Sequence, residues 1–220
     1  MRRFGVSALT VTAALSALTL LPAGSVSAAG SVLTYGSAGG SAVSVGDVLT
    51  ASLASGTKAA LATTSGGSTG ITCTGSSLSA KVTSNPAAPG TATESATSQT
   101  FSGCTSNVVG VTGVQSVTVN NLPYTTSAAS GGTVTVTPAS GSTIQTTVVL
   151  STLLGTVNCV YRASGLSAVS SNTANSLTFT NQAFTKASGS SLCAASGYFT
   201  AAYAPVVDSS VSGSPAVYTN

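Results

Sequence analysis

The stretch Val157-Asn158-Cys159-Val160-Tyr161 indicates the fold class, because Val157, Cys159 and Tyr161 fall on one face of an extended chain. This period-two alternation predicts a half-buried β-strand. Clusters of Gly, Ser, Asn and Pro separate it from similar short segments along the chain. The other candidate strands lie within 43–53, 71–73, 117–119, 134–136, 177–179 and 197–204. The sequence therefore predicts an all-β protein, an antiparallel β-sandwich or barrel.

Four cysteines stand at inward-pointing or loop positions of this pattern. In an exported chain, four cysteines form two disulfides, with three connectivities open. We expect Cys73–Cys104 and Cys159–Cys193, because each half of the chain then contains its own bridge. A metal or redox site is excluded as an interpretation, since the chain has no His and no C-x-x-C spacing.

The two halves resemble each other around these cysteines. Gln99–Phe101 precedes Cys104 much as Gln182–Phe184 precedes Cys193. Such echoes in conserved order predict a duplication with pseudo-repeats over 29–126 and 127–220 inside one β-sandwich domain, 29–220. In a chain this rich in Ser, Thr, Ala and Gly, a compositional echo is the alternative.

The composition excludes several functions. Only nine of 220 residues are charged, six Lys or Arg and three Asp or Glu, and there is no His. The chain therefore lacks the cluster of Lys and Arg that binding to nucleic acid requires, and it has no His to act as a base or as a metal ligand. The 39 Ser and 35 Thr fit the turns and outward strand faces of a β-protein.

The first 28 residues have the pattern of a secretory signal peptide. Arg2 and Arg3 form a short basic start, an uncharged, mostly apolar run follows to Leu21, and Val26–Ala28 fits signal peptidase cleavage. We expect the rest of the chain to be secreted, by the general or the twin-arginine route. No second apolar run is long enough for a bilayer, which predicts no integral membrane association.

Catalytic patterns in the chain are weak. Ser55–Lys58 matches the S-x-x-K spacing of a Ser–Lys dyad, but the companion motifs are absent and a turn is the simpler interpretation. Gly66–Gly70 matches G-x-S-x-G without any His to act as base. Glycosidases need paired carboxylates, and Asp47, Glu94 and Asp208 each stand alone among small polar residues. We expect no enzymatic activity, no cofactor and no metal site.

One aromatic group is a candidate binding surface. Tyr198, Phe199 and Tyr203 lie close together, and Tyr combines a flat apolar face with a polar tip. On a strand, Phe199 and Tyr203 share one side and Tyr198 faces the other. Ordinary core packing is the competing interpretation.

In its composition and residue pattern the whole chain resembles the exported, functionally uncharacterised β-proteins of actinobacteria. The likeness rests on the start Arg2–Gly5 and on stretches such as Gly110–Gln115 and Ile144–Leu150. In half-unit size, low charge and disulfides it is also similar to the immunoglobulin-like apoproteins of chromoprotein antibiotics, without a shared motif. No activity is carried over from either resemblance.

The function we expect is a secreted, non-enzymatic extracellular binding or structural component. A surface with so few charges predicts self-association or adhesion to a cell-wall partner. One alternative is a carrier of a small apolar ligand held between sheets, which a deep apolar cavity would favour. The second alternative is a hydrolase that uses carboxylates or a Ser–Lys pair.

Overall fold

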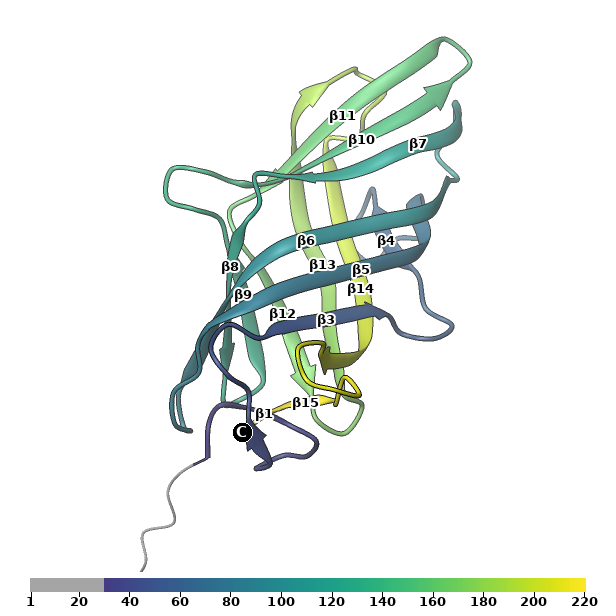
Figure 1. Cartoon of the computed structure of the whole chain (residues 1–220). Coiled ribbons are helices and arrows are strands. Elements are labelled where there is room, and N and C mark those ends of the chain that lie inside the picture. Colours follow the sequence, from purple (N-terminus) through teal and green to yellow (C-terminus); the bar gives the residue numbers. More distant parts are fainter. Residues whose placement is uncertain (1–29) are drawn as a thin grey trace, which may run out of the picture.

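Short alternating segments form fifteen strands in the computed structural model, which describes residues 30–220 (Figure 1). Within these residues the chain contains strands and turns but no helix. The predicted signal peptide lies outside the described residues. The strands are β1 (Leu33–Tyr35), β2 (Ser41–Ala42), β3 (Val48–Leu53), β4 (Ala59–Ala62), β5 (Gly70–Ser84), β6 (Thr91–Ser106), β7 (Val111–Asn120), β8 (Tyr124–Ala129), β9 (Thr133–Thr137), β10 (Ile144–Thr152), β11 (Gly155–Ala163), β12 (Leu166–Ser171), β13 (Ser176–Gly189), β14 (Ser196–Asp208) and β15 (Val217–Thr219).

The wall of the structure is a closed antiparallel barrel with eight strand positions. Their order is β3 with β4, then β5, β6, β8, β9, β12, β13 and β14, which returns to β3 and β4. β3 and β4 occupy one position in succession, because both pair with β5 on one side and with β14 on the other. The fold class predicted from the alternation is confirmed, and closure leaves no free edge in this ring.

Two sets of three strands form the wall between β6 and β13. In its lower half β8, β9 and β12 form it, and above them β7, β10 and β11 continue it (Figure 1). The long strand β13 pairs first with β12 and then with β11. On the other side, β6 pairs with β8 over 91–96, whereas no backbone ladder joins its remainder to β7 within the described chain. A seam without main-chain hydrogen bonds therefore runs between β6 and β7.

A small sheet of β15, β1 and β2 lies at the lower end of the barrel (Figure 1). Leu33 and Val217 of this sheet are buried against the core. The Asn85 side chain fixes β1 there, since its Nδ2 donates to the Leu33 and Val43 carbonyls at 2.8 Å and its Oδ1 accepts the Leu33 N–H. The first and last strands together form a floor for the barrel.

Both predicted disulfides are confirmed. Cys73 and Cys104 face each other across β5 and β6, and Cys159 of β11 joins Cys193 in the loop after β13. Two disulfides indicate an oxidising, non-cytoplasmic setting.

Two details differ from the sequence pattern. The candidate strand 43–53 begins only at Val48, because Gly46 has a φ of +102° and the turn 44–47 interrupts the extended chain. The two predicted halves also share one barrel, since β14 pairs with β3 and β4, and β1 pairs with β15. Whether the halves arose by duplication stays a prediction.

Candidate functional site

The interior of the barrel holds a partly open cavity of about 170 Å³. Its wall is mainly apolar, because the inward positions of the alternating strands carry Val, Leu, Ile, Ala and Phe. Strands of the lower barrel, the upper sheet and the floor all contribute, for example Val134, Val148 and Val217. An apolar internal cavity of this kind is the first candidate for a ligand site.

One acidic side chain lines this cavity. Glu94 of β6 lies between Val82 of β5 and Thr126 of β8 in the strand register and is only 6% exposed. The Thr126 hydroxyl donates a hydrogen bond to Glu94 Oε2, and no residue from 30 to 220 donates one to Oε1. The carboxyl group therefore faces the cavity with one oxygen free.

Burial dominates the chemistry of this carboxyl group. Desolvation raises the pKa of Glu94 from 4.5 to about 7, and the Thr126 hydrogen bond opposes this rise only in part. No Lys or Arg contributes to this pKa. Near neutral pH the cavity thus holds a group that exists in both the protonated and the ionised form.

Three tyrosine hydroxyls lie around the same core. Tyr203 bonds to Ser76 Oγ at 2.9 Å and accepts from Gln99 Nε2 at 3.0 Å. Tyr124 donates to the Asn120 carbonyl. Burial raises the pKa of all three phenols. Tyr161 lines the cavity, and its hydroxyl has no hydrogen-bond partner among residues 30–220. Tyr161 is therefore a second polar group that a ligand could reach.

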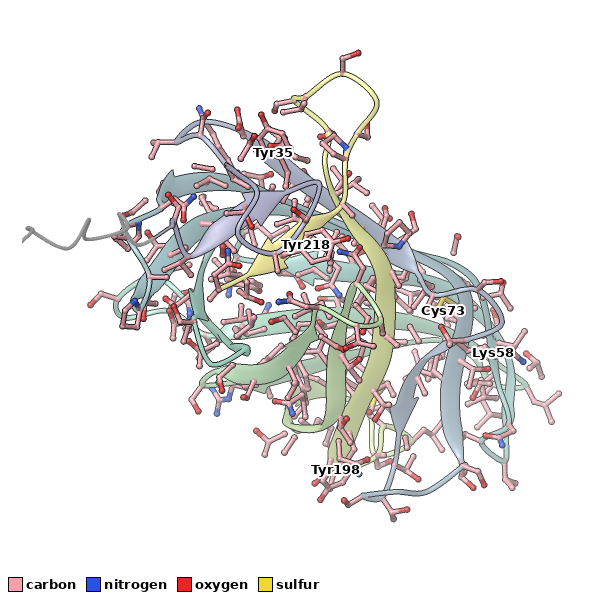
Figure 2. All side chains as sticks on the ribbon, turned by 90° about the horizontal axis from the view of Figure 1, so that it is seen from below. Tyr35, Lys58, Cys73, Tyr198 and Tyr218 are labelled. Atoms are coloured by element: carbon pink, nitrogen blue, oxygen red, sulfur yellow. A yellow bond between two sulfur atoms is a disulfide. The ribbon has the colours of Figure 1, made fainter. Side chains whose placement is uncertain are left out.

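The aromatic residues singled out from the sequence do not form one outer surface. Phe199 and Tyr203 are buried, and Phe199 lines the cavity beside Phe101 and Phe179, with ring centroids 6.1 and 5.7 Å away. Tyr198 is half-buried and projects from the rim, away from the interior (Figure 2). The expected outer surface of three rings is thus wrong, because alternation along β14 turns Phe199 and Tyr203 inward, while a binding role for Phe199 in the cavity wall stays a prediction.

Of the residues of the hydrolase alternatives, Glu94 alone lines the cavity, and within residues 30–220 it has no second carboxyl group beside it there. Ser55 and Lys58 are exposed in the turn between β3 and β4 (Figure 2). Asp47 and Asp208 contact each other where β3 begins and β14 ends, and Asp208 is fully buried. Burial raises the pKa of Asp208, a Ser210 N–H lowers it, and the neighbouring Asp47 raises it. Neither group is part of the cavity wall.

Sequence reasoning missed the role of Glu94. Its only signal is the alternation Ala92, Glu94, Ala96, which places the carboxyl group on the face that carries small apolar side chains. That face could be identified as interior only after β8 was placed beside β6, because Thr126 is 32 residues away.

No protein-family model matches the chain, no curated protein matches it, and no solved structure matches its fold. Within residues 30–220 no helix is long and apolar enough to cross a membrane. The class of protein is therefore defined by its own architecture, which over residues 30–220 is an antiparallel eight-stranded barrel with an apolar cavity and one carboxyl group, that of Glu94, in the cavity wall.

Proposed function

We propose that this protein is a secreted binding protein that carries a small apolar ligand in the barrel cavity. The observation that supports this is the cavity of about 170 Å³, lined by apolar side chains around the single carboxyl group of Glu94. Of the expectations raised by the sequence, the carrier is the one that a deep apolar cavity favours.

The size of the cavity limits the ligand. An apolar cavity of roughly 150 Å³ stays dry and binds benzene or xenon, so this cavity takes a molecule with about seven to ten non-hydrogen atoms. Burial of such a molecule removes apolar surface from water at about 25 cal/mol per Å². A larger ligand would require the wall to move.

The seam between β6 and β7 is the proposed entry route. Gln99 of β6 and Val117 and Val119 of β7 line the cavity from its two sides. Because no backbone ladder joins the strands there, opening the seam breaks side-chain contacts only. Opening the barrel between two hydrogen-bonded neighbouring strands would instead break main-chain hydrogen bonds.

Export of the chain accords with this role. A protein that works outside the cell is supported by two disulfides, a predicted signal peptide at residues 1–28 and a Ser- and Thr-rich chain with few charges. A carrier needs no catalytic group, and we propose none.

Toluene binding tests the proposal. Saturable binding, measured by calorimetry and by a rise in Tm with toluene concentration, is expected for the disulfide-bonded protein. Ala128 lines the cavity and is buried, so Ala128→Leu should occupy part of it and weaken toluene binding at least tenfold. The control is Ala174→Leu at an exposed turn position. Absence of saturable binding, or equal binding by Ala128→Leu, would refute the carrier.

A surface component is the second candidate, favoured by one observation. Val109, Leu153 and Leu154 are 97, 85 and 89% exposed on two neighbouring turns, joined in space because Val111 pairs with Thr152. Exposed apolar tips with no charge between them favour contact with a second copy of the chain. This candidate predicts association of the protein with itself.

A further inference from the structure

Side chains of the cavity wall offer hydrogen-bond acceptors without a protein partner. No Lys or Arg lines the cavity. Glu94 offers a carboxyl oxygen without a protein partner, and Gln99 offers Oε1, since its Nε2 is used by Tyr203. The side-chain donors on the wall are uncharged: hydroxyl groups, which can also accept, and the amide groups of Gln99 and Asn172. The wall therefore offers a cationic donor the Glu94 carboxylate as a partner, whereas it offers an anionic acceptor no cation.

We propose that the ligand carries a protonated amine on its apolar body and that this ammonium group pairs with Glu94. The inference rests on the proposed carrier function and names the chemical class of the ligand. An anionic ligand is excluded by the same geometry, because it would face the Glu94 carboxyl group with no cation in the wall.

Pairing with an ammonium group would offset the desolvation cost of ionised Glu94 in the protein without ligand. Ionised Glu94 has no cationic partner, so burial disfavours the charged form. An ammonium group within hydrogen-bond distance of Oε1 reverses this, and charge-assisted bonds are about twice as strong as neutral ones.

Only Glu94 among the groups that face the cavity changes charge near neutral pH. The phenols on the wall are Tyr124, Tyr161 and Tyr218, and burial raises the pKa of the first two above the ordinary value near 10. On the adjacent strand β5, Val82 faces Glu94, and on β8 Thr126 does. A pH dependence of binding between pH 6 and 8 therefore reports on Glu94.

Three probes of one shape test the inference: toluene, benzyl alcohol and benzylamine. Benzylamine stays protonated below about pH 9, as alkylamines do. Glu94 is ionised in about a tenth of the molecules at pH 6 and in about nine-tenths at pH 8. Because benzylamine pairs with the ionised form, the affinity for benzylamine should rise about tenfold between these two pH values. Toluene affinity should not change with pH. Benzyl alcohol affinity should not rise with pH.

Glu94→Gln keeps the shape and the hydrogen bond from Thr126 but removes the charge. It should bind benzylamine at least tenfold more weakly than the wild type at pH 8, without the pH dependence, and a cooperative urea unfolding transition shows that it is folded. Benzylamine affinity that is flat or falls with pH, or that survives Glu94→Gln, would overturn the amine class while toluene binding leaves the carrier intact. If neither toluene nor benzylamine binds, both proposals fall.

Discussion

Replacing Glu94 by Gln should stabilise the protein above neutral pH and leave its stability nearly unchanged in acid. The reason is that folding moves this carboxyl group from water to a site where it is 6% exposed, which raises its pKa from 4.5 to about 7. Below pH 4.5 the folded and unfolded chains both hold the proton. Between pH 4.5 and 7 the unfolded chain releases it first, so the wild type loses stability as the pH rises through this window.

The magnitude follows from the two pKa values. Each pH unit between 4.5 and about 7 removes 1.36 kcal/mol, which amounts to about 3 kcal/mol in total. For a domain of this length, 1 kcal/mol corresponds to roughly 2–4 °C in Tm, so the difference between the two proteins should grow by about 6–12 °C. Above pH 7 both states are ionised and the difference should stay constant.

Urea unfolding at pH 4, 5.5, 7 and 8.5, with the disulfides intact, measures this difference. All other ionisable groups are the same in both proteins, so their contributions to the difference cancel. Thr126→Val removes the hydroxyl that lowers the pKa of Glu94 and should move the end of the falling region to higher pH. A difference between wild type and Glu94→Gln that is the same at all four pH values would refute a desolvated Glu94.

Three further predictions concern the core, the bridges and assembly. Replacing Cys73 and Cys104 by Ala should lower the free energy of unfolding by about 3–4 kcal/mol, the chain-entropy value for a separation of 31 residues, as urea titration would measure; a loss under 1 kcal/mol would contradict it. Tyr203→Phe should cost about 1–3 kcal/mol in the same assay, because buried Ser76 loses its partner, and an unchanged midpoint would contradict that bond. Sedimentation should show association that rises with concentration, depends weakly on salt and is reduced by Leu154→Ser, whereas a monomer throughout would remove the surface-component candidate.

The local features of the fold could be predicted from the sequence. Alternation along a strand depends only on the period of the extended chain, so the inward positions of Cys73 and Cys159 followed directly from their neighbours. The bridges followed from cysteine parity and from keeping each pair within one half of the chain. The turn at Gly46 was missed because a positive φ competes with alternation at a single residue.

The candidate site could not be predicted in the same way. Glu94, isolated in the sequence, has Thr126 and Val82 as its neighbours in the register of three strands. Whether its face was interior or exterior depended on which strands closed beside β6. Desolvation, and with it the pKa, is a property of that closure rather than of residues 92–96.

An all-β chain with two bridges and very few charges could be predicted from residue order and composition, because strand period, cysteine pairing and composition are local or additive properties. The three-dimensional structure was needed to show that the strands close into a barrel, that β14 returns beside β3 and β4, and that β1 and β15 cover its lower end. Those pairings join residues up to 186 positions apart, as Leu33 with Thr219, and no local pattern specifies them. The cavity and its one carboxyl group exist because of those distant pairings, since a strand acquires an interior only when its partners surround it.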